Sequence, residues 1–198
     1  MELVPLVFSS GWASGVNAYL VVLILGIFGR VTDVGDVPDA LPRIDVLVVA
    51  GVLYGMEFVA DKIPYIDSTW DAISTAIRPT AGAVIAVLLA GDASTLEQAL
   101  LAVLGGGTAL ASHAVKAGMR LAINTSPEPV TNVGASLGED VTVAGVVVLA
   151  MYHPWIALGV TAVLLVVGVV LVFVIMRRIR RGWRRWKGKD RGAVAGRT

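Results

Sequence analysis

Three sets of polar residues interrupt long apolar stretches, and each set falls on one face of a helix. The sets, with i, i+3, i+7 or i, i+4, i+7 spacing, are Tyr54, Glu57 and Asp61; His113, Lys116 and Arg120; and Ser10, Ser14 and Asn17. Residues at these spacings share a helix face. The first set is acidic, the second is basic, and the third carries hydroxyl and amide groups. Such side chains can pair, exchange protons or bind a polar solute.

The cost of placing charge inside a membrane favours convergence of the three faces. An ionisable group in the middle of a membrane helix costs about 2.5–3.5 kcal/mol on insertion scales, so such groups usually pair and face inward. One interpretation is a structural network in which Glu57 pairs with Lys116 and Asp61 pairs with Arg120. The other is a hydrated polar pathway, because the hydroxyl groups, the histidine and the tyrosine exceed what two ion pairs require.

Among specific chemistries, the sequence favours a proton or cation relay through Glu57, Asp61 and His113. Buried carboxylates can hold protons, and histidine changes charge near neutral pH. A metal site of the same three residues is disfavoured, because Lys116 would repel the cation. A serine hydrolase built on Ser14 and His113 lacks a third orienting group and the G-x-S-x-G pattern. We therefore expect no enzyme activity, no metal and no cofactor.

The chain that carries these faces is unusually apolar. Of its 198 residues, 56% are hydrophobic and 16% are charged, whereas soluble domains are about half apolar and a quarter charged. The absence of cysteine from the sequence excludes disulfides and thiolate chemistry. This composition predicts an all-α, polytopic integral membrane protein and excludes an ordinary soluble domain.

About 20 apolar residues span the hydrocarbon layer, and six segments are candidates when kinked or short helices are accepted. They are 4–29, 45–61, 68–90 with a kink at Pro79, 96–123, 141–152 and 155–176. We expect about six transmembrane helices in a single domain, residues 1–176, with halves 1–92 and 93–176. A basic cytoplasmic tail, residues 177–198, follows.

The distribution of charge orients this arrangement. Residues 177–198 carry ten basic groups and one acid, whereas residues 1–176 carry six basic groups and fourteen acids. The positive-inside rule places the tail in the cytoplasm, and six crossings then place the N-terminus there too. We expect a multi-pass protein of the bacterial cytoplasmic (inner) membrane, with a tail that contacts anionic lipid headgroups. Nucleic-acid binding is not expected from so short a tethered segment.

Short motifs recur in the two halves. Residues 13–18 resemble 111–117, and residues 45–52 resemble 140–146. Because three spans separate the equivalents, a true relationship would be a three-plus-three inverted repeat, as in many transporters. The alternative is coincidence in a chain rich in alanine, valine and glycine.

Two pairs of glycines have i, i+4 spacing: Gly11 with Gly15, and Gly51 with Gly55. Small residues at this spacing let helices approach closely in a membrane. They predict tight packing and no chemistry.

The longest polar connector on the cytoplasmic side covers residues 124–140, and its prolines predict a loop. If this loop lies beside Lys116 and Arg120, it adds hydrogen-bond donors to two cations. A gate or a lipid-headgroup site there would include Asn124, Thr125 and Ser126.

Four motifs together are similar to a known family: GWASGVNAYL, FVADKIPYIDS, RPTAGAV and SHAVKAGMRLAINTSPEPVTN. As a set, they resemble an uncharacterised family of small multi-pass membrane proteins, catalogued as domain of unknown function 4126. The resemblance covers roughly residues 4–152. It implies a membrane location and brings no reaction, substrate or cofactor.

The leading hypothesis is transport or conduction of a small polar or anionic solute, coupled to protons or cations. In it, Glu57 and Asp61 handle protons or cations, Lys116, Arg120 and Asn17 contact the solute, and Ser10 and Ser14 line the path. One alternative is lipid-headgroup binding or lipid transport at the inner leaflet. Another is a structural or accessory membrane subunit. A homo-oligomer is compatible with each.

Overall fold

The computed structural model describes residues 3–32, 37–63, 65–124 and 129–195, and all regular structure in these ranges is α-helical. The helices are α1 (Leu3–Val31), α2 (Ile44–Ala60), α3 (Ile66–Ala90), α4 (Thr95–Ile123), α5 (Pro129–Tyr152) and α6 (Pro154–Ala195). The predicted all-α class is confirmed. The segment around Pro79 is one helix, as expected.

Five of the helices in the described ranges are long and apolar enough to cross a membrane. The exception is α2, which has 17 residues. This length corresponds to about 26 Å of α-helix, less than the roughly 30 Å of the hydrocarbon layer. The helices are therefore those of a multi-pass membrane protein, while a sixth complete crossing is not confirmed.

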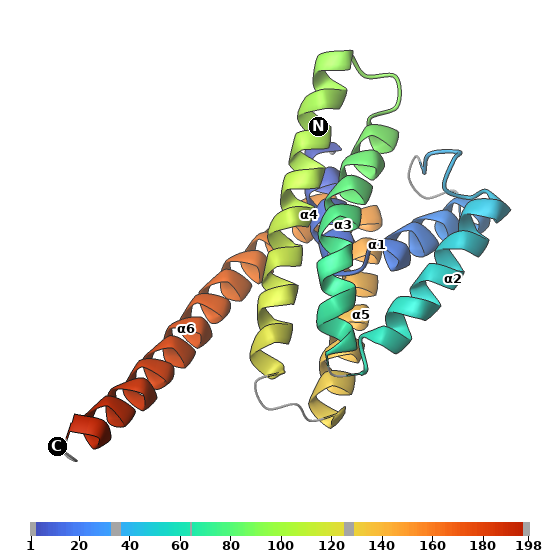
Figure 1. Cartoon of the computed structure of the whole chain (residues 1–198). Helices are drawn as coiled ribbons and strands as arrows, with labels where there is room; N and C mark the ends of the chain where they lie inside the picture. Colours follow the sequence, from blue (N-terminus) through green and yellow to red (C-terminus); the bar gives the residue numbers. More distant parts are fainter. Residues whose placement is uncertain (1–2, 33–36, 64, 125–128, 196–198) are drawn as a thin grey trace.

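The first helix is broken at Asn17, whose backbone angles (φ −152°, ψ 93°) are not helical. Its first half packs along α4, with Gly15 against Ala109, and its second half packs along α2, with Gly26 against Leu47. Figure 1 shows the second half turning away from the first, out of the bundle and toward α2. The break thus changes the direction of α1 in the middle of the protein.

As a result, both ends of α1 lie at the same end of the bundle. Leu3 and Ala93, the latter in the turn between α3 and α4, pack on the same small apolar cluster. Phe28 makes an edge-to-face contact with Tyr152, next to the turn between α5 and α6. The sequence predicts a first helix that crosses to the opposite side, but the structure turns it back at Asn17. The start of α1 and the C-terminal end of α6 consequently lie at opposite ends (Figure 1).

Glycines allow the central helices to approach closely. A Cβ atom added to Gly11 would lie 2.6 Å from the carbonyl oxygen of Gly105, and Gly15 is equally crowded by the α4 backbone. The predicted tight packing at these two glycines is confirmed. The matching prediction for α2 is wrong, because Gly51 has one ordinary contact at 3.9 Å and no described atom comes within 4 Å of a Cβ at Gly55.

The inverted repeat is not confirmed. Gly11 and Gly15 face Gly105 and Ala109 in that order, so the first half of α1 runs in the same direction as α4. An inverted repeat that relates residues 13–18 to 111–117 would make the two segments run in opposite directions.

The connector predicted to be a loop over residues 124–140 is mostly helical, because α5 begins at Pro129. Proline suits the first position of a helix, where its missing N–H has no intrahelical partner to lose. Asn132 and Ser136, one turn apart, are 0% and 1% exposed. This early start of α5 adds a further polar helix face to the interior.

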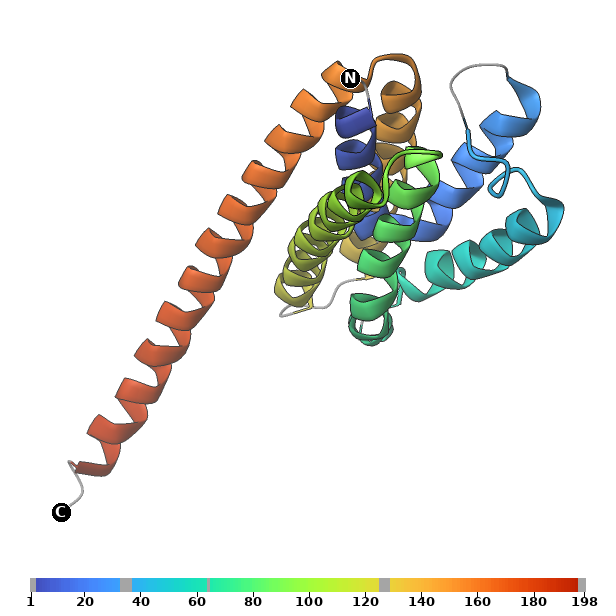
Figure 2. The same cartoon turned by 90° about the horizontal axis from the view of Figure 1, so that it is seen from above.

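The last helix has 42 residues and continues from the apolar segment into the basic tail. The expected boundary between residues 176 and 177 therefore lies inside a helix. Figures 1 and 2 show the C-terminal half of α6 leaving the other helices.

Candidate functional site

Ionisable residues from four helices converge next to the break in α1. We name this group the charge cluster: Glu57 on α2, Asp61 at its end, Asp67, Asp71 and Arg78 on α3, Lys116 and Arg120 on α4, and Glu139 and Asp140 on α5. The members from residues 57–120 are 0–4% exposed. The expected convergence of the acidic and basic faces is therefore observed, with additional members.

Lys116 lies at the centre of the charge cluster. Its Nζ is 2.6 Å from Asp61 Oδ2, 3.3 Å from Glu57 Oε1 and 3.5 Å from Glu139 Oε2. It also donates a hydrogen bond to the carbonyl oxygen of Val16 at 3.0 Å. One ammonium group thus joins α1, α2 and α5 to α4.

Arg120 extends the cluster toward the end of α2. It donates to Glu139 Oε2 at 2.6 Å and to the carbonyl oxygen of Asp61 at 2.8 Å. Its Nη2 is 3.4 Å from Asp61 Oδ2, and its Nη1 is 3.8 Å from Asp67 Oδ2. Both ion pairs predicted from the sequence, Glu57 with Lys116 and Asp61 with Arg120, are confirmed.

Arg78 connects α3 to the same carboxylates. It donates to Glu57 Oε1 at 2.8 Å, and its Nη1 is 3.0 Å from Asp71 Oδ1. The same Nη1 lies 2.8 Å from His113 Nδ1, while His113 Nε2 lies 3.0 Å from Thr75 Oγ1. A guanidinium only donates, so Nδ1 accepts and Nε2–H donates to Thr75. His113 is therefore held as a neutral ring that orients Arg78, and the proton relay through it stays a prediction.

The break in α1 supplies backbone oxygens to the cluster. In a regular helix the Leu20 N–H would donate to Val16, but here it donates to Asn17 Oδ1 at 3.0 Å, and the Val16 oxygen accepts from Lys116. Asn17 Nδ2 donates to Asp140 Oδ1 at 3.0 Å. The side chain of Asn17 thus caps the second half of α1 and fixes α5 beside it.

The remaining predicted residues take several positions around the cluster. Tyr54 donates from Oη to Asp140 Oδ2 at 3.3 Å. Ser10 and Ser14 are 1% and 0% exposed, and their hydroxyl groups have no hydrogen-bond partner in the described part of the chain. Asn124 donates to Asp67 Oδ1 and to Ser68, each at 2.8 Å. Thr125 and Ser126 lie outside the described residues.

Carboxylates outnumber cations in the cluster. Among the described residues it contains six carboxylates and three cations, and the half-exposed Lys62 on the turn after α2 is a fourth cation at its edge. Burial lowers the pKa of the Lys62 ammonium. Glu57 Oε2, Asp61 Oδ1 and Asp71 Oδ2 have no described hydrogen-bond partner, while Asp71 Oδ1 is the oxygen that pairs with Arg78. If every carboxylate were ionised, the cluster would carry net negative charge inside the protein.

A cavity of about 370 Å³ adjoins the cluster between α1, α4, α5 and α6. Its lining includes Ser112, Lys116, Glu139 and Thr142, and otherwise it is mainly apolar. A cavity bounded by Glu57, Asp61, His113 and Lys116 would fit the predicted pathway, but of these only Lys116 lines the observed one. The Glu139 side chain is 22% exposed, lines this cavity and pairs with Lys116 and Arg120, so it joins the cavity to the cluster.

Sequence reasoning missed five of the nine members of the cluster. Asp67, Asp71 and Arg78 share a face of α3 at i, i+4 and i+11, so the helical-spacing rule applied to the other helices would have found them. Glu139 and Asp140 were missed because their segment was interpreted as a loop.

The sequence model of a family described as "Domain of unknown function (DUF4126)" matches residues 4–174. The chain belongs to this family. The match extends beyond residue 152, where the resemblance was expected to end, and it includes every residue of the charge cluster. No curated protein and no solved structure matches this DUF4126 chain.

In the described ranges of this DUF4126 protein, no group of three or more histidine or acidic side chains is arranged to hold a metal ion. Glu57 and Asp61 face Lys116, and His113 faces Arg78. The site is therefore a network of ion pairs with surplus carboxylates beside a cavity.

Proposed function

We propose that this protein carries protons or small cations across a membrane through the charge cluster, as part of the transport of a small polar solute. The observation that supports this function is the excess of carboxylates over cations in the cluster, which is four to three among its buried members and six to three when the partly buried Glu139 and Asp140 are included. An uncompensated buried charge is costly, and a carboxylate avoids the cost by taking up a proton or a cation. A cluster with more carboxylates than cations is thus suited to binding a proton or a cation.

The broken helix supports the same function. Transporters often place their ion sites where a discontinuous helix frees backbone carbonyl groups near the middle of the membrane. Here the carbonyl oxygens of Gly15 and Val16 face Arg78 and Lys116 at the break. A small movement of either cation would expose these oxygens together with a carboxylate.

The proposed route begins at the cavity beside Glu139 and passes Asp61 and Glu57 to Asp71. Ser14 and Ser10, with buried and unpartnered hydroxyl groups, would continue it along α1 toward the turn between α3 and α4. This order uses the acids and serines named in the sequence hypothesis and adds Glu139 and Asp71.

The cluster favours protons and cations over the anionic solute considered from the sequence. Lys116, Arg120 and Arg78 each lie within 3.5 Å of at least two carboxylate groups. An anion could bind these cations only by displacing a carboxylate. A neutral or cationic solute in the cavity meets no such competition.

The membrane orientation is part of the proposal. Arg177 and the basic residues after it mark the cytoplasmic side by the positive-inside rule, in the bacterial inner membrane. Because the two ends of α1 lie at the opposite end of the bundle, the N-terminus would face the other side. This replaces the expectation that both termini are cytoplasmic.

The lipid-headgroup alternative is weaker at the place where the sequence suggested it. Lys116 and Arg120 are 4% and 0% exposed and are paired with carboxylates, and Asn124 is bonded to Asp67. An accessory subunit or a homo-oligomer would need an apolar contact surface, and exposed side chains of α2 such as Val48 and Val52 could form one. Contact with lipid explains their exposure just as well, so they do not favour this alternative.

The test is ion flux into liposomes that contain the purified protein and a trapped pH dye. With a potassium gradient and valinomycin driving uptake, the protein should admit protons faster than protein-free liposomes. Asp71→Asn, which removes the charge of a buried carboxylate on the proposed route, should reduce the rate about tenfold or more. Glu97→Gln, on an exposed part of α4, should leave it unchanged.

Two results would contradict the proposal. One is wild-type protein that moves neither protons nor radiolabelled sodium faster than empty liposomes. The other is an Asp71→Asn variant that elutes as the folded protein and conducts as fast as wild type, which would remove the cluster from the path.

A further inference from the structure

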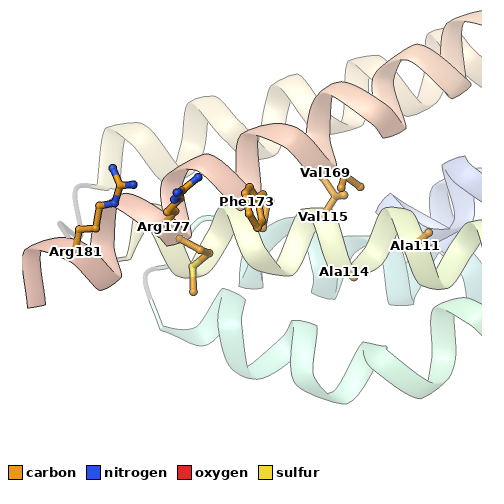
Figure 3. A pocket seen from close by; sticks show the side chains of 9 residues that line it. Ala111, Ala114, Val115, Val169, Phe173, Arg177 and Arg181 are labelled. Carbon is orange, nitrogen blue, oxygen red and sulfur yellow. The ribbon is translucent and has the colours of Figure 1, made fainter. Parts of the chain in front are cut away.

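A second hollow of the protein lies away from the charge cluster, on the outer side of α4 and α6. It is a groove of about 780 Å³ whose α4 side is formed by Ala111, Ala114 and Val115. Figure 3 shows Val169, Phe173, Arg177 and Arg181 following one another along α6 above these residues. The groove is therefore apolar along most of its length and basic at one end.

Close contacts between the two helices form the inner wall of this groove. A Cβ atom on Gly118 would lie 2.8 Å from Val172 Cγ1, and one on Gly168 would lie 2.5 Å from Val115 Cγ1. These contacts keep α6 against α4, and the small side chains of Ala111 and Ala114 leave the surface beside the contact hollow. The groove is thus formed by the packing of α6 against α4.

The length of the groove matches one leaflet of a bilayer. Val169 and Arg181 are twelve residues apart on α6, which is about 18 Å of helix. One leaflet contributes about half of the roughly 30 Å hydrocarbon layer. An extended acyl chain would lie along the valines and Phe173, with its headgroup at the level of the arginines.

The basic end of the groove favours a lipid with a negatively charged headgroup. Arg177 and Arg181 have i, i+4 spacing, so both lie on the side of α6 that borders the groove. Both are exposed, and no carboxylate is among the described residues that line the groove. Guanidinium groups bind phosphate oxygens in a bidentate manner. Unlike Lys116 and Arg120, these two arginines are available to an anion.

From the apolar length, the small-residue floor and the paired arginines, we infer that the α4–α6 groove binds an anionic phospholipid. One acyl chain lies between the two helices, and the phosphate contacts Arg177 and Arg181. This site is separate from the charge cluster, and its binding does not depend on ion transport.

The experiment is native mass spectrometry of the full chain, released from detergent with phosphatidylglycerol or with phosphatidylcholine of the same acyl chains. Wild-type protein should retain one phosphatidylglycerol at concentrations where phosphatidylcholine is lost. Arg177→Gln should reduce that retention about fivefold to tenfold. Arg178→Gln removes the same charge from the next residue, which does not line the groove, and should change retention less than twofold.

A second pair of variants tests the acyl-chain part of the site. Val169→Trp fills the groove and should reduce retention of phosphatidylglycerol at least fivefold. Val170→Trp adds the same bulk at a neighbouring position that is equally exposed, 54% against 51%, and lies outside the groove, so it should have little effect.

Three outcomes would overturn the inference. Equal retention of the two lipids would remove the headgroup selectivity. Equal losses in Arg177→Gln and Arg178→Gln would show general attraction to a basic helix. Wild-type retention in Val169→Trp would show that no acyl chain occupies the groove. A single elution volume for all variants ensures that each result reports on folded protein.

Discussion

The ammonium group of Lys116 donates a hydrogen bond to the carbonyl oxygen of Val16 at 3.0 Å, at the point where α1 is broken. The same ammonium is 2.6 Å from Asp61. One side chain therefore depends both on the broken backbone and on the buried carboxylates. Lys116 thus links the charge of the cluster to the point where the two halves of α1 meet.

Replacing this central cation should destabilise the protein strongly. Lys116→Met leaves Glu57 and Asp61 close together without the ammonium between them, and loss of one partner of a buried ion pair costs about 3–5 kcal/mol. The free energy of unfolding in detergent measures the effect. Lys62→Met, at a half-exposed lysine on the turn after α2, should cost less than about 1 kcal/mol. Equal losses of unfolding free energy in the two variants would mean that Lys116 does not hold the charge cluster together.

Close packing between α1 and α4 should be sensitive to a single methyl group. In Gly15→Ala, the new Cβ meets the backbone of Ala109, which cannot move aside, so we expect about 1–3 kcal/mol of destabilisation. Gly55→Ala adds the same group where no described atom comes within 4 Å, and it should be neutral or slightly stabilising. Melting temperatures in one detergent provide the comparison, and similar shifts in both variants would contradict the packing.

Much of this architecture follows from local rules. Apolar length predicts the helices, and His153 with Pro154 marks the turn between α5 and α6, where the structure ends one helix and begins the next. Helical spacing predicts that Glu57 and Lys116 face each other. These features depend on residues close in sequence or on the cost of burying charge, so a single sequence contains them.

The break at Asn17 could not be predicted in the same way. Asn17 is a residue type that can cap a helix, but no proline lies near it, and the long apolar stretch around it predicts one continuous span. The break is stabilised by partners far along the chain, Asp140 through Asn17 Nδ2 and Lys116 through Val16. These hydrogen bonds, which replace the ones that α1 loses at the break, form only after the helices have assembled. The same reason explains why a polar segment such as 129–140 folds as a helix.

The path of α1 makes a topological prediction that differs from that of a straight helix. Because the sequence has no native cysteine, Val4→Cys and Val31→Cys can each be labelled in intact cells with a membrane-impermeant maleimide. Both positions are exposed, and we expect both to react from the same side of the membrane. Trp155→Cys and Arg181→Cys, near opposite ends of the span in α6, should react from different sides. Reaction of Val4→Cys and Val31→Cys from opposite sides would show that α1 crosses the membrane as one continuous span.

The hydrogen bond between Asn17 and Asp140 predicts the outcome of an exchange of the two residues. Asn17→Asp keeps an acceptor for the Leu20 N–H but brings two carboxylates together, so it should destabilise the protein by about 1–3 kcal/mol. Adding Asp140→Asn restores a donor opposite the new carboxylate, and the double variant should recover most of the loss. Unfolding in detergent, measured for both single variants and the double variant, gives the coupling energy. A double variant no more stable than Asn17→Asp would show that this contact does not hold the break in place.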